Sequence, residues 1–496
     1  MKWTTEKRYQ NYDNWDAATL LQLQAQAANS PYQMHYHIRP QSGLLNDPNG
    51  FSYYNGEFHV FYQNFPFGPV HGLKSWFHMT SPDLVHWENK GLALIPDTVY
   101  DSHGAYSGSA LPLPSGDLFL MYTGNHRDAD WIRTPYQLGA LMDSKGNVTK
   151  LDHPLIMPPD YVSEHFRDPQ VIRYNDTYYA LLGAQDQETK TGHIVVYKSR
   201  DLKQWQDLGY LDFTEQEMGY MIECPNLVFV NDQPVLIFCP QGLDKNIASY
   251  DNIYPNMYLI GEDIRLNGPK MTPAQPQPLN LDDGFDVYAS QAFNAPDGKA
   301  YLISWVGLPD TTYPTDSEGW ANCLSQVKEL ELRDGHLYQH PVVAMGSLRQ
   351  QGTLLRPERR VNDRQQLLDQ SGNQYELRLT LRKNQHGSLY LAASADLSQG
   401  LRLDFNTGAD ASLTLDRGQA GLAVATDYGT TRTITLPAHR DCQLDIFIDG
   451  SLCEVFVNDG HNVMTARFFA DPSHQTVAFV AEQTIDFTGT YWPLKK

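Results

Sequence analysis

The sequence predicts an all-β protein in which a five-bladed β-propeller is followed by a C-terminal β-sandwich. Three observations carry this prediction: a hairpin pattern that recurs five times, a closing stretch of short alternating segments, and an aromatic content of 12%. Aromatic residues favour strands, and period-two alternation of apolar and polar residues is typical of a strand with one buried face.

At 496 residues the chain is too long for a single typical core, so we expect two main domains. The one strong helix candidate, DAATLLQLQAQAANS, begins at Asp16, a residue type that caps helices, and ends before Pro31. We predict a helical extension at 1–30, a propeller at 31–341, a linker at 342–371 and a sandwich at 372–496.

Each recurring hairpin has an apolar run, a turn with Gly or Asn-Asp, and a second apolar run that is often aromatic. The turns lie roughly 60 residues apart, which fits a propeller blade with long connections. Beyond residue 371, segments such as YELRLTLR and TRTITLPA, separated by Asp-Gly turns, indicate the sandwich. The hairpins are predicted at 50–63, 107–124, 168–184, 225–242 and 291–307.

The residues just before each hairpin are unusually polar. Because propeller blades surround a central channel, equivalent positions of the blades point to the same place. We therefore expect these residues to line one mouth of the channel: Asn46, Asp47, Tyr106, Ser107, Arg167, Asp168, Glu223, Asp286 and Tyr288.

Three acids of this ring suit the hydrolysis of a glycosidic bond, which needs two carboxyl groups flanking that bond. Asp47 lies in the turn NDPNG, and Asp168 follows Arg167, whose charge should keep the carboxylate ionised. Glu223 lies between apolar residues in IECPN, which should raise its pKa as a general acid requires. Each motif alone is commonly a simple turn; their shared phase in the repeat is what singles them out.

Six motifs, in matching order across nearly the whole chain, closely resemble the β-fructofuranosidase family of glycoside hydrolases. They are HIRPQSGLLNDPNGF, YSGSA, HFRDPQV, IECPNLV, LDDGFDVYASQAF and FIDGSLCEVFVNDG. The resemblance implies a five-bladed propeller with a sandwich and a retaining hydrolase that needs no cofactor and no metal.

Residue by residue, the resemblance implies that Asp47 is the nucleophile, that Glu223 is the acid/base, and that Asp168 with Arg167 holds the fructosyl hydroxyls. In a retaining enzyme the carboxyl groups of Asp47 and Glu223 should lie about 5 to 5.5 Å apart. His71 stands where many secreted members carry Trp, which changes the outer wall of the pocket. The implied substrate-binding residues are Asn46, Gln63, Trp76, Tyr106, Ser107, Arg167, Tyr288 and Trp305.

The segments EKRYQNYDNW, FPFGPVHGLKSW and PDTVYDSHGAYSGS look most like bacterial members of this family that cleave sucrose 6-phosphate into fructose and glucose 6-phosphate. Sucrose itself should also be a substrate. A phosphate needs cationic or N–H donors. The loop positions indicate four candidates, each of which taken alone is more commonly a solvated surface charge: Lys74, Arg127, Arg133 and Lys245.

Two other functions stay open. An exo-acting fructanase or a fructosyltransferase on fructooligosaccharides would use the same three acids and differ only in the acceptor site. A non-catalytic sugar-binding propeller would be expected to lack at least one acid, whereas Asp47, Asp168 and Glu223 are all present.

The formal charge of −21 argues against a nucleic acid or an anionic membrane as partner, which leaves a small-molecule sugar. The first 30 residues hold no apolar core of signal-peptide length, and no uncharged apolar run of about 18 residues could span a bilayer. The five scattered cysteines indicate reduced thiols. We predict a cytoplasmic enzyme that is a monomer or a homodimer.

Two features suggest other chemistry. His35 and His37 alternate as strand residues do and could form a metal pair, but no third ligand follows at a suitable spacing, so structural histidines are expected. Cys224 beside Glu223 could be a nucleophile, but the sequence shows no base partner for it, so a packing role is expected.

Overall fold

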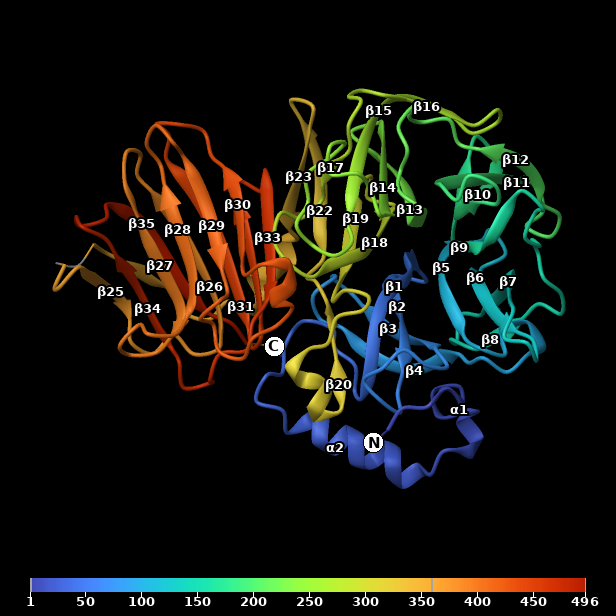
Figure 1. The fold of residues 1–496 in the computed structure, drawn as a ribbon, viewed down its shortest axis with the longest axis horizontal. Coiled ribbons are helices and arrows are strands. Elements are labelled where there is room, and N and C mark those ends of the chain that lie inside the picture. The colour runs from blue at the N-terminus through green and yellow to red at the C-terminus, as the bar shows by residue number, and fades with distance from the viewer. Residues whose placement is uncertain (1, 358–359, 496) are drawn as a thin grey trace.

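The computed structural model describes residues 2–357 and 360–495, so the ends of the predicted extension and sandwich and residues 358–359 of the predicted linker lie outside the described residues. The described strands form seven sheets (Figure 1). Five sheets of four or five strands make a propeller, and two six-stranded sheets make a sandwich beside it, drawn in orange and red. The predicted fold class is confirmed.

The first three blades are regular antiparallel sheets, except that one short strand from far along the chain joins blade 1 in parallel. Blade 1 contains β1 (Gly43–Tyr54), β2 (Glu57–Phe65), β3 (Ser75–Ser81), β4 (Glu88–Leu94) and the added β20 (Trp320–Ala321). Blade 2 contains β5 (Ala105–Pro112), β6 (Leu118–Arg127), β7 (Arg133–Met142) and β8 (Val148–Lys150). Blade 3 contains β9 (Val162–Tyr174), β10 (Thr177–Asp186), β11 (Gly192–Ser199) and β12 (Gln206–Tyr210).

The last two blades each carry a short additional strand. Blade 4 contains β13 (Met221–Val230), β14 (Gln233–Gln241), β15 (Met257–Arg265), β16 (Lys270–Pro273) and β17 (Leu279–Asn280). Blade 5 contains β18 (Val287–Asn294), β19 (Ala300–Val306), β21 (Cys323–Leu324), β22 (Lys328–Arg333) and β23 (His336–Pro341). The five predicted hairpins are the first two strands of the five blades.

The innermost strands β1, β5, β9, β13 and β18 contact one another in that order, and β18 contacts β1, so the ring is closed. Side chains bridge the backbones of neighbouring blades. Gln291 Oε1 accepts from Phe51 N at 2.8 Å, and Ser109 Oγ accepts from Val171 N at 2.8 Å. These bonds pair backbone groups that an open strand edge would leave free, and they fix each blade against the next.

The sandwich packs its two sheets around one apolar core of leucine, isoleucine, valine and phenylalanine. One sheet contains β24 (Thr353–Leu355), β26 (Gln374–Leu381), β31 (Cys442–Asp449), β32 (Leu452–Val457), β33 (Asn462–Arg467) and β35 (Phe487–Pro493). The other contains β25 (Arg364–Leu368), β27 (His386–Ala393), β28 (Leu401–Asn406), β29 (Ser412–Asp416), β30 (Thr431–Thr435) and β34 (Thr476–Val480). The strands β24 and β25 lie inside the predicted linker, so these two segments belong to the sandwich rather than to a linker.

The N-terminal segment carries the helices α1 (Thr5–Arg8), η1 (Tyr12–Asn14) and α2 (Ala17–Ala28). Asp16 caps α2 by accepting from Ala18 N, which confirms the predicted helix and its start. Trp15 stacks on Phe67 at 4.6 Å between ring centroids, so the segment is anchored on blade 1. No helix in the described part of the chain is long and apolar enough to cross a membrane. The remaining short helices are η2 (Val99–Asp101), η3 (Pro314–Glu318), η4 (Val343–Leu348) and η5 (Thr426–Tyr428).

Buried ionic contacts join the two domains. His37 contacts Asp449 (Nδ1 to Oδ2, 2.8 Å) and Glu454 (Nε2 to Oε2, 2.9 Å). These pairs connect the segment before β1 to strands β31 and β32. His37 therefore has a structural role, as expected from the sequence.

Asp286, predicted to line the channel mouth, faces the sandwich instead. Its carboxylate accepts from Arg417 Nη1 at 2.5 Å, from Arg467 N at 3.0 Å and from the hydroxyl of Tyr313 at 2.9 Å. The prediction for Asp286 was wrong. Its position in the sequence, two residues before Tyr288, does not reveal that the sandwich packs against its side chain.

Candidate active site

The predicted ring coincides with breaks in strand register. All five innermost strands shift register against their partners at this end, at 45–48, 105–108, 167–170, 223–226 and 288–291. Asp168 and Cys224 adopt left-handed backbone conformations there, with φ of 66° and 49°. A β-bulge turns side chains out of the regular alternation, and non-glycine residues with positive φ are strained. The bulges aim the polar side chains into one place.

Asp47 is held by two side chains on its two carboxylate oxygens. Ser107 Oγ donates to Oδ2 at 2.5 Å, and Asn46 Nδ2 donates to Oδ1 at 3.1 Å. Gln63 joins the network because it accepts from Asn46 Nδ2 at 2.9 Å and donates to Ser107 Oγ. Three polar residues from β1, β2 and β5 thus fix one carboxylate.

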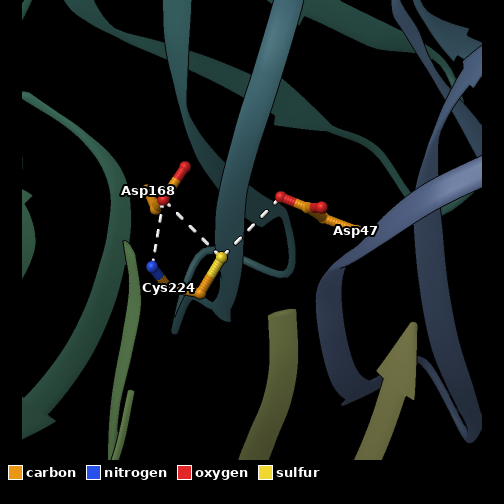
Figure 2. Close-up of side chains that lie close together, drawn as sticks. All are labelled: Asp47, Asp168 and Cys224. Carbon is orange, nitrogen blue, oxygen red and sulfur yellow. Dashed lines mark hydrogen bonds between the residues drawn. The ribbon is translucent and has the colours of Figure 1, made fainter. Parts of the chain in front are cut away.

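Asp168 lies across a thiol from Asp47, as Figure 2 shows. Its Oδ2 accepts from Cys224 N at 3.0 Å, and Cys224 Sγ lies 3.6 Å from this oxygen and 3.7 Å from Asp47 Oδ2. The backbone of Asp168 is anchored by Thr123, whose Oγ1 accepts from Asp168 N at 3.1 Å. The thiol fills the space between two carboxylates.

Glu223 receives hydrogen bonds on both carboxylate oxygens. Arg167 donates to Oε1 from Nε at 3.0 Å and from Nη2 at 2.7 Å, and the hydroxyl of Tyr288 donates to Oε2 at 2.5 Å. Arg167 Nη1 also contacts His165 Nδ1 at 3.1 Å. Because an arginine is only a donor, His165 Nδ1 accepts and its proton sits on Nε2.

The pKa shifts of the three acids differ in sign. Burial raises the pKa of Asp47, although Lys74 and Ser107 act in the opposite direction. Burial also raises the pKa of Asp168, against the effect of Arg167. Burial alone would raise the pKa of Glu223 too, but the charge of Arg167 and the hydrogen bonds from Tyr288 and Arg167 outweigh it, so this pKa is lowered.

Both pKa expectations from the sequence were wrong. The apolar neighbours of Glu223 were expected to raise its pKa, and Arg167 was expected to keep Asp168 ionised. In the fold Arg167 reaches across to blade 4 and binds Glu223, and its charge still lowers the pKa of Asp168, but burial of Asp168 outweighs this effect. Sequence neighbours on a strand point to opposite faces, so adjacency is a poor guide to ionic partners.

Asp47, Asp168 and Cys224 could in principle hold a metal ion, since one ligand atom of each lies within 4.8 Å of the others. Thiol ligands bind metals as thiolates. Burial and the two carboxylates raise the pKa of Cys224 well above its ordinary value, so it stays a protonated thiol. The donor set fits a hydrogen-bonding thiol between carboxylates better than a metal centre, and a high pKa also suits packing rather than nucleophilic attack.

The predicted aromatic residues lie in different layers. Tyr288 contacts Glu223 directly, whereas Trp76 is fully buried behind the site and donates its indole N–H to Tyr106 O at 2.9 Å. Trp305 is also buried, with its ring centroid 6.2 Å from that of Tyr288 and 6.4 Å from that of His71. Trp76 and Trp305 therefore support residues of the site from behind.

Lys74 lies closer to the carboxylates than its prediction as a phosphate ligand implied. It is buried, and its ammonium lies 5.5 Å from the centroid of the Tyr106 ring. Burial lowers the pKa of Lys74 to about 8, although Asp47 and Glu223 raise it. A cation near three acids offsets part of the repulsion between them. The sequence does not reveal this role, because only the folding of blade 1 brings the lysine close to the acids.

Lys245 was predicted from the sequence as a phosphate ligand, whereas His165 was not predicted as a site residue. Lys245 is exposed on the loop after β14 with its ammonium 5.1 Å from the ring centroid of Tyr250, outside the cluster around Glu223. His165, which sequence reasoning missed, stands two residues before Arg167 on β9 and so shares its face. The sequence feature that could have identified His165 as a site residue is its place in the motif HFRDP.

Two family models cover nearly the whole chain. The model for the glycosyl hydrolases family 32 N-terminal domain matches residues 37–341, and the model for the family 32 C-terminal domain matches residues 345–493. The two matches coincide with the propeller and the sandwich.

Curated proteins and solved structures are similar over almost their full length. A sucrose-6-phosphate hydrolase of Pediococcus pentosaceus is 49% identical over 99% of this chain and 96% of its own, and one of Streptococcus mutans is 45% identical over 98% of both. The structure of a sucrose-6-phosphate hydrolase from Lactobacillus gasseri is 62% identical with a TM-score of 0.97, covering 100% of this chain and 99% of its own. A β-fructofuranosidase of Bombyx mori is 27% identical with a TM-score of 0.81, covering 97% and 99%. The chain therefore belongs to family 32 of the glycosyl hydrolases, as the resemblance of its motifs to β-fructofuranosidases indicated.

Proposed function

We propose that the chain is a retaining β-fructofuranosidase that hydrolyses sucrose 6-phosphate to fructose and glucose 6-phosphate, and also cleaves sucrose. The observation that carries the reaction is that Asp47 and Glu223 lie close enough for their charges to interact, with each carboxylate held by its own donors. The substrate is supported by the name sucrose-6-phosphate hydrolase that the similar bacterial proteins carry.

In the first step Asp47 attacks the anomeric C2 of the fructosyl unit, and the bond from C2 to the leaving oxygen breaks. Glu223 protonates that oxygen. Ser107 and Asn46 each hold one oxygen of Asp47, so the nucleophile meets C2 in a fixed orientation. In a substrate-bound crystal structure the two carboxyl groups should lie about 5 to 5.5 Å apart.

Glu223 must carry a proton to act as the acid, although its contact with Arg167 favours the ionised form in the free site. We assign the change to substrate binding. When the fructosyl hydroxyls take hydrogen bonds from Arg167, the contact with Glu223 weakens, and burial then dominates and raises the pKa of Glu223. Substrate binding thus prepares the acid.

Asp168 is assigned to the fructosyl hydroxyls together with Arg167. Its Oδ2 already accepts from Cys224 N at 3.0 Å, which leaves Oδ1 for a hydroxyl donor. Such a bond strengthens as positive charge develops on the fructosyl ring in the transition state. The role is positional and electrostatic rather than nucleophilic.

In the second step a water molecule attacks C2 of the fructosyl ester, and Glu223, now ionised, takes a proton of that water. The bond from C2 to the Asp47 oxygen breaks, which releases fructose and restores the Asp47 carboxylate. Two inversions at C2 give net retention of configuration. The contacts that lower the pKa of Glu223 favour its ionised form, which the base role requires.

The same three acids would serve an exo-acting fructanase or a fructosyltransferase. The discriminating experiment compares kcat/KM on sucrose 6-phosphate, sucrose and inulin with one enzyme preparation. A marked preference for the phosphorylated sugar supports the proposal. Equal or better activity on sucrose or inulin contradicts it and indicates a general invertase or a fructanase, and no activity on any of the three favours a binding protein.

We also propose a cytoplasmic location. All five cysteines are free and buried, which suits a reducing compartment. A phosphorylated sugar carries charge that keeps it from crossing a bilayer, so its hydrolase belongs where the sugar is phosphorylated.

A further inference from the structure

Two arginines face each other at the end of the blade 2 hairpin. Arg127 and Arg133 are direct cross-strand partners of β6 and β7, and both are half-buried. Like charges directly opposite each other on a sheet are destabilising. Such an arrangement needs a compensating negative charge.

Among the described residues, Glu164 acts on Arg133 through its charge and raises its pKa, against the larger effects of burial and of Arg167 and Arg127. Neither arginine takes part in an ion pair with a described residue, and the buried Nε of each has no hydrogen-bond partner. Asp128, in the same turn, uses its Oδ1 to accept from the backbone of Asp130 and Ile132. Partly buried guanidinium groups with unused donors favour an anionic ligand.

Other cations continue this cluster toward Glu223. Burial is the largest cause that lowers the pKa of Arg133, and the charges of Arg167 and Arg127 lower it further. The three guanidinium groups therefore interact electrostatically. Arg167 in turn holds Glu223 at 2.7 Å. A path of positive charge therefore runs from the acid/base carboxylate to the rim of blade 2, in a chain whose formal charge is −21.

Aromatic side chains build a wall beside this path. The Arg127 guanidinium lies 5.0 Å from the ring centroid of Trp131 and donates to Trp131 O at 2.7 Å. Tyr9, which follows α1, lies 5.4 Å from both Trp131 and His103 between centroids. The N-terminal extension thus helps to enclose the arginines, and the partial burial strengthens their electrostatic attraction for an anion.

We propose that Arg127 and Arg133 bind the phosphate group of the leaving glucosyl unit. The inference rests on the proposed function. Because Glu223 protonates the leaving oxygen, the leaving sugar starts at Glu223 and extends outward past Arg167 toward blade 2. Planar guanidinium groups bind phosphate oxygens with two parallel N–H donors, which gives both affinity and orientation.

The other two phosphate candidates from the sequence have different places. Lys74 is buried beneath Tyr106 and interacts mainly with Asp47 and Glu223. Lys245 is exposed on a loop of blade 4. Only the blade 2 pair combines partial burial, unused donors and a position beyond Arg167.

The test compares kcat/KM on sucrose 6-phosphate and on sucrose for the wild type, Arg133→Gln, Arg127→Gln and the control Lys245→Gln. We expect the ratio of the two values to fall about 10- to 100-fold in each arginine variant, since a hydrogen bond to a charged group is lost. Lys245→Gln removes the same charge and should keep the ratio. The melting temperatures of the variants separate misfolding from loss of recognition.

Inorganic phosphate and glucose 6-phosphate serve as probes that need no turnover of the phosphorylated sugar. Both should inhibit sucrose hydrolysis competitively in the wild type, and about 10-fold or more weakly in Arg133→Gln. If the wild type prefers sucrose 6-phosphate and both arginine variants fold and keep the full preference, the phosphate-binding role of the two arginines is wrong, while the proposed substrate stands. A wild type with no such preference overturns the proposed substrate first.

Discussion

The Arg167 guanidinium donates from both Nε and Nη2 to a single oxygen of Glu223, at 3.0 and 2.7 Å, although the two residues lie on different blades. The other Glu223 oxygen accepts from the hydroxyl of Tyr288 at 2.5 Å. The proposed acid/base is therefore held in its ionised form in the free site, while Asp47 and Asp168, with raised pKa values, hold protons more readily. This inequality of the three carboxylates leads to the following predictions.

Asp47→Asn should lose turnover by at least about 1000-fold on sucrose and on sucrose 6-phosphate, because the amide cannot form the fructosyl ester. Burial raises the pKa of Asp47, so the fold disfavours its ionised form, and the variant should melt at the same or a higher temperature. Steady-state kinetics and thermal unfolding check both statements. Asp176→Asn, at an exposed turn, is the control. Activity retained by Asp47→Asn would refute the assignment of Asp47 as the nucleophile.

Glu223→Gln should reduce kcat on sucrose about 100- to 10,000-fold, since general acid and base assistance are both lost. A fructoside with a strongly acidic leaving alcohol should lose less in the first step because it needs little protonation. Added azide should attack C2 of the ester on Asp47 and release fructosyl azide with retained configuration, which nuclear magnetic resonance can identify. Glu188→Gln, an exposed acid on blade 3, should behave as the wild type. Inverted azide product would exclude the double displacement.

Tyr288→Phe should move the alkaline limb of the pH profile of kcat/KM to higher pH. The hydroxyl of Tyr288 stabilises the ionised form of Glu223, so its removal raises the pKa of Glu223. A general acid works only while protonated, and a higher pKa therefore extends activity toward alkaline pH. The measurement is kcat/KM across the pH range on sucrose. An alkaline limb that stays in place, or moves to lower pH, contradicts the acid role of Glu223.

His37→Gln should destabilise the protein on the order of 3 kcal/mol near pH 6. Burial alone would lower the pKa of His37, but hydrogen bonds with Asp449 and Glu454 outweigh it and raise the pKa to about 9. A raised histidine pKa stabilises the fold fully below the unfolded value near 6.5 and loses this contribution as pH rises through about 9. The difference in unfolding free energy between wild type and variant should therefore shrink from pH 6.5 to pH 9.

His35→Gln provides the matched control for the stability experiment, because His35 is an exposed histidine two residues away. It should change the unfolding free energy little at any pH in this range. A difference for His37→Gln that is constant with pH would show that packing, rather than the charge on the imidazole, joins the two domains there.

Much of the fold and the positions of the three acids could be predicted from local pattern. The five hairpins stand out because alternation of buried and exposed side chains is a property of each strand by itself. Asp47, Asp168 and Glu223 share one phase of that repeat, and all five inner strands break register at this phase. The sequence therefore indicated which residues gather at the channel mouth.

Short edge strands escaped this reasoning. β24 and β25, inside the predicted linker, are three and five residues long and pair with β35 and β34, more than 100 residues later in the chain. Segments so short carry too few alternations to be read as strands. They are ordered by the long-range partners against which they pair.

The sequence by itself determined the repeat, the fold class and the proposed catalytic side chains that the repeat presents, since these depend on spacing along one strand or one hairpin. The folded arrangement alone determined the charged neighbours: Arg167 with Glu223, Asp286 with Arg417, and Arg127 opposite Arg133, neither of which forms an ion pair with a described acid. Charges interact through space, and in a closed propeller the nearest charge commonly comes from the next blade or from the other domain. For this reason the pKa values of the site, unlike its composition, became apparent only in three dimensions.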